Sequence, residues 1–211
     1  ILRGLLRFWP LFATVRGGLL RRPQDLVLLI PAVLDPELRT LKGNYNYVFL
    51  GVGGIGVGTN GVLLAMAAHL NGKAAGVMEM AGLAQKGGAV HIHCRIGETP
   101  EDISAIRVAL GECDALIGGD LVVSAQGNTL GLMAPTGGAV VNRHEIITGE
   151  FTRDTGFAIP GADLHLALTA RLHERARLFN ATLLAETALG DTVYANMILL
   201  GAAYQQGLLP L

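Results

Sequence analysis

The sequence is poor in cysteine, aromatic residues and charge, and each shortage excludes a class of protein. The 211 residues include two cysteines, Cys94 and Cys113, which have neither a CxxC nor a Cys/His ligand spacing. The chain alone therefore cannot hold a four-cysteine iron–sulfur cluster or a zinc site, and no disulfide framework is indicated. Only 16% of the residues are charged whereas 51% are hydrophobic, which excludes a disordered protein and indicates burial of apolar surface against partners.

Long apolar runs are also missing. The longest, Leu26 to Leu34, has nine residues and contains Pro31, whereas a membrane-spanning helix needs roughly 20 apolar residues. Arg3, Arg7 and Arg16 interrupt the first stretch, which lacks the apolar core and cleavage site of a signal peptide. We therefore expect no membrane span and a cytoplasmic protein.

Charge divides the chain into two parts. Residues 1–42 carry seven Lys or Arg against three Asp or Glu, a net +4, and the remainder carries nine basic and fourteen acidic residues, a net −5. This change predicts an N-terminal basic apolar arm or linker over residues 1–43 and a folded domain over 44–211. The arm is expected to dock on a larger neighbour, with an interfacial amphipathic helix as the alternative. Nucleic acid is a poor candidate partner because the folded part is acidic.

From Asn44 onward, strand-like and helix-like segments alternate. This pattern predicts an α/β, Rossmann-like layered fold with a largely parallel sheet, preceded by a short helical basic arm. The expected strands are 45–50, 73–80, 89–96, 115–117, 139–141 and 177–181. The expected helices are one capped by Thr59 or Asn60 and reaching Leu70, one from Thr99 to Gly111, and one from Asp191 to Gln206.

One expected strand, 89–96, has a polar face formed by His91, His93 and Arg95. Such a strand lies near an edge, pairs antiparallel, or lines a cleft, since fully buried parallel strands are continuously apolar. We consider three interpretations of this face: a solvated edge, a surface for a ligand or partner, or a metal site at the two histidines. The metal site is the weakest because no third ligand is indicated.

A glycine-rich turn follows the first expected strand. The glycines Gly51, Gly53 and Gly56 satisfy G-x-G-x-x-G between a strand and a helix, a context in which backbone N–H groups and a helix N-terminus can hold an anionic group. For a nicotinamide enzyme an acidic residue should follow about 20 residues later, but the candidate, Glu79, comes 28 residues after Gly51. A dinucleotide site, another anion or cofactor contact, and a purely structural turn all remain open.

Other candidate chemistry is sparse. Lys86 lies in a glycine-rich loop and is either a contact for an anion or a solvated lysine. His144 and Glu145 follow the expected strand 139–141 and line either a cleft or an ordinary loop. Gly119-Asp120 followed by Asn128 is a poor match to a thiamine diphosphate motif, and we reject a thiamine site in this chain.

Three segments, taken together, resemble the gamma domain of 2-oxoacid:ferredoxin oxidoreductases, over roughly residues 45–211. Within this family, the indolepyruvate ferredoxin oxidoreductase group is the most similar. The chain departs from the family pattern at one place: many gamma domains have Arg-Gly-Gly where this chain has Lys86-Gly87-Gly88. The segments are Gly51 to Thr59 (GVGGIGVGT), Gly82 to Val90 (GLAQKGGAV) and Leu189 to Gly201 (LGDTVYANMILLG).

The resemblance implies a multi-part enzyme that decarboxylates a 2-oxo acid on thiamine diphosphate. It would pass electrons through iron–sulfur clusters to ferredoxin and hand the acyl group to coenzyme A. Thiamine and clusters would reside on partner subunits or domains, and this chain alone would be inactive. It implies no catalytic or metal-binding residue here, and a contact for coenzyme A or a partner loop at Gly51, Gly53, Gly54, Gly56, Thr59, Lys86, Gly87 and Gly88. The alternatives are a free-standing NAD(P)-dependent oxidoreductase and a non-catalytic assembly module.

Overall fold

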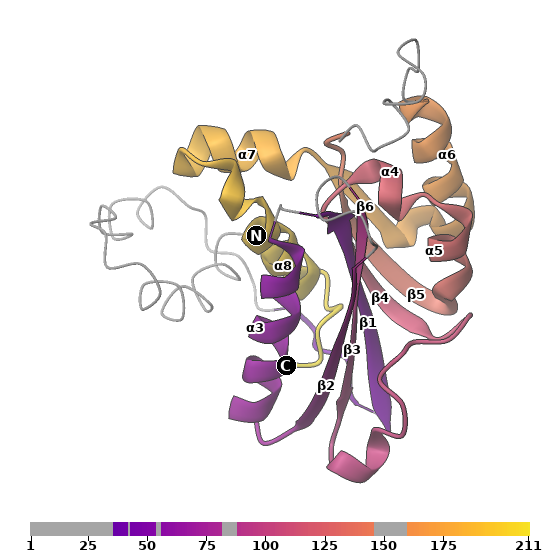
Figure 1. The fold of residues 1–211 in the computed structure, drawn as a ribbon, viewed down its shortest axis with the longest axis vertical. Helices are drawn as coiled ribbons and strands as arrows, with labels where there is room; N and C mark the ends of the chain where they lie inside the picture. The colour runs from indigo at the N-terminus through magenta and orange to yellow at the C-terminus, as the bar shows by residue number, and fades with distance from the viewer. Residues whose placement is uncertain (1–35, 42, 54–55, 82–87, 146–159) are drawn as a thin grey trace.

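The computed structural model describes residues 36–41, 43–53, 56–81, 88–145 and 160–211. Six strands form one sheet in the order β2-β3-β1-β4-β5-β6 (Figure 1). Their bounds are β1 Asn44–Val52, β2 Ala74–Ala81, β3 Ala89–Gly97, β4 Cys113–Gly118, β5 Met133–Asn142 and β6 Ala176–Phe179.

The sheet is parallel on one side of β1 and antiparallel on the other. β1, β4, β5 and β6 are parallel neighbours, whereas β3 is antiparallel to both β1 and β2. The predicted α/β layered fold with a largely parallel sheet is therefore confirmed. The segment with the polar face, β3, is the strand that pairs antiparallel.

Helices cover both faces of the sheet (Figure 1). α3, α7 and α8 lie over one face, and α4, α5 and α6 lie over the other. The helices are α3 Val57–Leu70, α4 Leu121–Ser124, α5 Gly127–Leu132, α6 Gly161–Leu172, α7 Ala181–Leu189 and α8 Ala195–Gln205, with 3-10 turns at Pro100–Asp102, His173–Arg175 and Thr192–Tyr194.

β1 supplies both hydrophobic cores because successive side chains of a strand point to opposite faces. Tyr47 and Phe49 are fully buried on the face covered by α3 and α8. Val48 and Leu50 are fully buried on the face covered by α4 and α6. β1 is therefore held between two hydrophobic cores, and its carboxyl end leads directly into the candidate site.

The C-terminal helical segment starts as the sequence predicts but is divided in two. Asp191 Oδ1 accepts a hydrogen bond from the Val193 N–H at 2.9 Å, which confirms Asp191 as a helix cap. A 3-10 turn over Thr192–Tyr194 comes first, and α8 then runs from Ala195. All the residues of α8 from Ala195 to Tyr204 are buried, because the helix is packed between the sheet and its helical neighbours.

The helix expected from Thr99 to Gly111 is wrong. Its first turn forms as predicted, with Asp102 Oδ2 accepting from the Thr99 N–H at 2.9 Å, but the turn ends at Asp102. The following residues cross one face of β2 and β3 in irregular conformation, with Ile106 against Gly76. Covering that face overrides the local helical signal.

Two further predictions concern the N-terminal basic arm and the absence of a membrane span. The basic arm lies mostly outside the described residues, so its helical character stays a prediction. Among the residues that the structure describes, every helix is too short or too polar to traverse a lipid bilayer.

Candidate functional site at the carboxyl end of the sheet

Gly53, directly after β1, lies beside Gly88, the residue that precedes β3. The Gly53 N–H donates to the Gly88 carbonyl oxygen at 2.8 Å, and Val52 is paired with Ala89 where the two strands meet. The structure thus brings together Gly51, Gly53 and Gly88 of the predicted site. Gly54, Lys86 and Gly87 lie outside the described residues.

Gly56 directs the chain from this turn into α3. Its backbone is left-handed, with φ at 78° and ψ at 24°, and it is the N-cap residue; glycine adopts this conformation without a steric penalty. The expected side-chain cap at Thr59 or Asn60 is therefore wrong, because α3 begins earlier, at Val57. Thr59 is exposed on the first turn, and its N–H donates to the Gly56 carbonyl at 3.2 Å.

Two buried asparagines lie near this turn; the sequence suggested Asn60 only as a helix cap and did not point to Asn196. A Cβ on Gly56 would lie 3.5 Å from Asn196 Nδ2, so α8 approaches the glycine turn closely. Asn60 in α3 is buried, and its Oδ1 has no hydrogen-bond partner among the residues that the structure describes. Asn196 belongs to the segment Leu189 to Gly201 that carries the family resemblance, which is the signal that could have identified it.

The position of Glu79 differs from that of the acidic residue in a dinucleotide site. In that arrangement the acid ends the strand next to the first one, whereas here β3 separates β2 from β1. Glu79 lies beside the start of α3, with Oε2 3.5 Å from a Cβ built on Gly58. A carboxylate there interacts favourably with the helix dipole and opposes an anionic ligand at the same place.

Asn142 joins three elements at the carboxyl edge of the sheet. Its Nδ2 donates to the Gly119 carbonyl at 3.1 Å and to Thr182 Oγ1 at 2.8 Å. Its Oδ1 accepts from the N–H groups of His144 and Ala181 at 3.2 and 3.0 Å. The ends of β4 and β5 and the start of α7 are thereby held in fixed relation.

Asp120 is a structural residue at this edge. It is fully buried, and its Oδ1 accepts from the Val123 N–H at 2.8 Å as the cap of α4. A carboxylate used in this way stabilises the first turn of the helix. His144 and Glu145 are exposed at the same edge, directly after β5, so they are accessible from solvent.

The polar face of β3 is mostly covered, so the interpretation as a solvated edge is wrong for His93 and Arg95. His93 is buried, and its Nδ1 accepts from the Val108 N–H at 3.0 Å. Arg95 is buried and donates to Glu112 Oε2 at 2.5 Å and to the Arg107 carbonyl at 3.1 Å. The irregular segment after the first 3-10 turn supplies all three partners.

Desolvation keeps the two β3 histidines neutral. Burial lowers the pKa of His93 to about 4, with smaller contributions from His91 and two arginines. Burial also lowers the pKa of His91, which is half-buried. In the part of the chain that the structure describes, no group of three His, Cys, Asp or Glu side chains is arranged to hold a metal ion.

Comparison with known proteins identifies the family of this chain. A family model described as pyruvate ferredoxin/flavodoxin oxidoreductase matches residues 46–211. The chain belongs to this family. The indolepyruvate oxidoreductase subunit IorB of Archaeoglobus fulgidus is 29% identical over 164 residues, which is 75% of each chain.

Solved structures share the fold. Pyruvate oxidoreductase subunit PORC of Thermotoga maritima has a TM-score of 0.53 and 19% identity, with 76% of this chain and 75% of that one covered. The gamma subunit of a keto/oxoacid ferredoxin oxidoreductase from Geobacter sulfurreducens has a TM-score of 0.52 and 23% identity, with 80% and 79% covered. The 2-oxoglutarate:ferredoxin oxidoreductase of Magnetococcus marinus has a TM-score of 0.50 and 16% identity, and the match covers 77% of this chain and 24% of that one.

Proposed function

We propose that this chain is the gamma component of a 2-oxoacid:ferredoxin oxidoreductase complex that oxidatively decarboxylates a 2-oxo acid to an acyl-coenzyme A. The observation that carries the proposal is the family match over residues 46–211. The relation to a subunit of indolepyruvate oxidoreductase favours an aryl pyruvate, such as indolepyruvate, as the substrate. We place the complex in the cytoplasm and the boundary of the gamma domain near Gly43.

Thiamine diphosphate and the iron–sulfur clusters belong, in this proposal, to partner subunits or domains, and ferredoxin accepts the electrons. Cys94 and Cys113 lie on different strands and are buried. They belong to the hydrophobic cores on opposite faces of the sheet, so the two thiols cannot ligate one cluster together. The buried capping role of Asp120 likewise supports a thiamine site elsewhere.

The role of the chain in this complex is to provide a backbone-lined surface at the carboxyl end of β1. A helix N-terminus offers N–H groups that have no partner within the helix, although the Thr59 N–H of α3 already donates to the Gly56 carbonyl, and Gly88 connects the segment that carries Lys86 to this edge. A loop of a partner subunit would bind there, or a phosphate of coenzyme A with the charge of Lys86 offsetting that of Glu79. The candidate residues remain Gly51, Gly53, Gly54, Gly56, Thr59, Lys86, Gly87 and Gly88.

Substituting Lys86 tests the contact with coenzyme A in the assembled complex. Lys86→Gln removes the positive charge, and we expect the KM for coenzyme A to rise about three- to tenfold, the value of one exposed charge-assisted contact. Lys86→Arg is the matched control, because it keeps the charge and should stay near the wild-type KM. The KM for the 2-oxo acid should not change in either variant, and an unchanged coenzyme A KM in Lys86→Gln would remove this residue from the site.

Copurification tests the proposal as a whole. We expect the chain to purify with subunits that contain thiamine diphosphate and iron, and to lose 2-oxo acid oxidation when separated from them. Saturable micromolar binding of NADH by the chain would instead support a free-standing NAD(P)-dependent oxidoreductase. A chain that shows no dependence on any ligand, and whose deletion causes only loss of the complex, would support a non-catalytic assembly module.

A further inference from the structure

The sheet has an open edge at β2. In the described part of the chain, β2 has one strand neighbour, β3, so one side of its eight residues presents unpaired backbone N–H and C=O groups. Natural edge strands are usually protected by proline, by a bulge or by several charged side chains. β2 has no proline, pairs with β3 in continuous register from Ala74 to Ala81, and carries one charged residue, Glu79.

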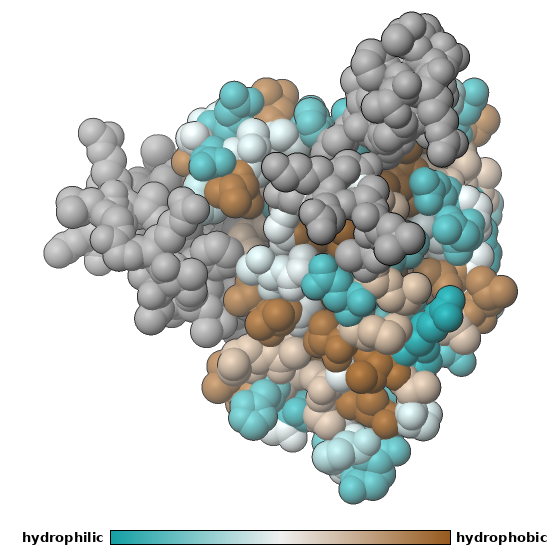
Figure 2. Space-filling view, viewed as in Figure 1, coloured by the Kyte–Doolittle hydropathy of each residue, from teal (hydrophilic) through white to brown (hydrophobic). Residues whose placement is uncertain are grey.

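Apolar side chains of α3 extend the surface beside this edge. Val62, Met66 and Leu70 are 62%, 45% and 70% exposed. Their spacing of four residues places them in one row on the helix, and α3 packs against β2. Figure 2 shows apolar surface across the face of the molecule on which β2 lies in the foreground.

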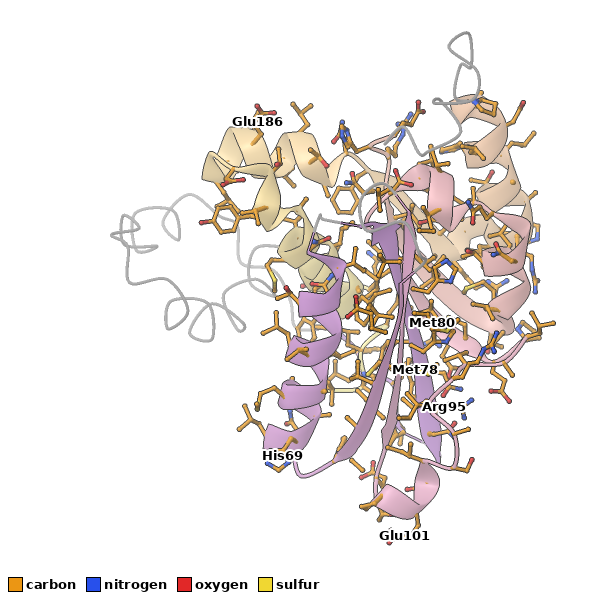
Figure 3. The ribbon with its side chains drawn as sticks, in the orientation of Figure 1. His69, Met78, Met80, Arg95, Glu101 and Glu186 are labelled. Atoms are coloured by element: carbon orange, nitrogen blue, oxygen red, sulfur yellow. The ribbon has the colours of Figure 1, made fainter. Side chains whose placement is uncertain are left out.

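A groove follows the first half of β2. Its volume is about 610 Å³, and it is bounded by α3 on one side and by the residues after the first 3-10 turn on the other. Lining residues include His69, Lys73, Ala75, Gly76 and Ile106. Met78 and Met80 continue the apolar surface along the strand beyond this groove, and both are half-buried (Figure 3).

We infer that β2 pairs antiparallel with β2 of a second copy of this chain, so that the two six-stranded sheets become one continuous sheet across a two-fold axis. Two charged residues, Glu79 in β2 and Lys73 directly before it, favour one register. With the axis at Gly76, Lys73 lies directly opposite Glu79 of the second copy, and the same pair recurs by symmetry. Opposite charges at directly facing positions stabilise a strand pair.

The side-chain sizes favour the same register. Met78 then faces Ala74 of the second copy, and Val77 faces Ala75, so each large side chain meets a small one. Moving the axis by one residue, to Ala75 or Val77, removes both ion pairs. Lys73 Nζ already contacts Glu98 Oε1 at 2.7 Å, but an ammonium has three N–H donors and can also bind a second carboxylate.

The same axis would bring the two α3 helices towards each other, because each packs over the face of β2 that carries the odd-numbered residues. This placement follows from Val77, which packs against Gly61 of α3. Burying the rows of Val62 and Met66 would add apolar contact to the backbone pairing. The pairing does not depend on the proposed function.

Sedimentation of the 211-residue chain and of its charge variants tests the inference. We expect a dimer whose dissociation constant rises about tenfold in Glu79→Lys, because two attractive pairs become repulsive. Lys73→Glu should weaken the dimer similarly, and the double variant Lys73→Glu/Glu79→Lys should restore it. Leu166→Lys on α6 is the matched control: Leu166 is 65% exposed, and this change should leave the dimer intact.

Cross-linking tests the register itself. In the double variant Ala74→Cys/Met78→Cys, each new thiol faces its counterpart in the second copy, with Cβ atoms about 5 Å apart. A short bis-maleimide should therefore join two chains. Each single variant is the control and should give little cross-linked dimer, while the native thiols Cys94 and Cys113 are buried.

Three results would overturn the inference. One is a monomer at all accessible concentrations, both for the chain alone and when copies are counted in the purified complex. Another is a dimer that is insensitive to the charge variants and does not cross-link. The third is a complex in which a strand of a different subunit protects the amides of β2 from hydrogen exchange.

Discussion

Individual buried polar side chains hold the backbone in place at the carboxyl edge of the sheet and on the polar face of β3. Asn142 satisfies four hydrogen-bonding groups from three elements, and His93 supplies the acceptor for the Val108 N–H. Apart from His144, each partner lies 15 or more residues away in the sequence, so the local pattern does not show the contact. Buried polar groups of this kind fix a single arrangement because leaving a partner unsatisfied costs about 1–3 kcal/mol.

His93 should make folding stability dependent on pH. Its pKa is lowered to about 4 in the folded chain, whereas an unfolded histidine titrates near 6.5. The unfolded state therefore binds more protons between these values, so its contribution to stability is complete above about pH 6.5 and is lost as the pH falls towards 4. We expect His93→Asn, which keeps an acceptor near the Nδ1 position, to flatten this part of the profile.

Urea unfolding of the wild type and His93→Asn at pH 4.5, 5.5 and 7 would measure the difference. The two free energies of unfolding should converge as the pH falls, with a differential change on the order of 2 kcal/mol. A parallel pair of profiles would show that His93 is not the titrating group.

At the scale of elements, α3 contains two glycines with opposite constraints. A Cβ on Gly61 would lie 2.7 Å from Ile92 Cγ2 and 3.2 Å from Val77 Cγ1, whereas one on Gly58 would have a nearest contact of 3.5 Å. The first glycine permits close approach of the helix to β2 and β3. The second has room for a methyl group.

Alanine at these two positions should therefore have effects of opposite sign. Gly61→Ala should destabilise the fold by about 1–3 kcal/mol through overpacking. Gly58→Ala, its matched control, should be neutral or stabilise by up to about 1 kcal/mol through helix propensity. Thermal unfolding of the two variants beside the wild type measures both, and equal shifts would contradict the packing argument.

The elements predicted from sequence are those that local pattern determines. The apolar run of β1, the alternation of β3 and the cap at Asp191 are all local signals, and the structure contains each of them. The helix expected after Thr99 fails because Ile106 and Val108 are required against β2 and β3. The entry to α3 was expected too late because the left-handed backbone of Gly56 replaces a side-chain cap.

The candidate site was predictable only in part. Gly53 and Gly88, both named as candidate contacts from the resemblance, lie side by side because β1 and β3 pair to their ends; their role in binding stays a prediction. The approach of Asn196 to Gly56 depends on how α8 packs 140 residues later in the chain. No local spacing encodes that contact.

At the scale of the whole molecule, the reactivity of the two thiols can show whether the two hydrophobic cores open together. Cys94 on β3 and Cys113 on β4 are both fully buried, one in each core. Burial raises the pKa of both to about 12. Reagents that attack thiolates therefore need the sheet to open.

Thiol alkylation should consequently follow global unfolding. We expect both cysteines to react with iodoacetamide at the same slow rate in native buffer, and within minutes in 6 M urea, as followed by mass spectrometry. Rapid reaction of one thiol under native conditions would show that its core opens independently of the other.

The burial of α8 also has a consequence for synthesis on the ribosome. Tyr47 and Phe49 emerge about 150 residues before the helix that covers them, a delay on the order of ten seconds at ordinary elongation rates. During that interval α3, which follows β1 directly, can cover only part of this aromatic face. We therefore expect the nascent chain to expose apolar surface until α8 has left the exit tunnel.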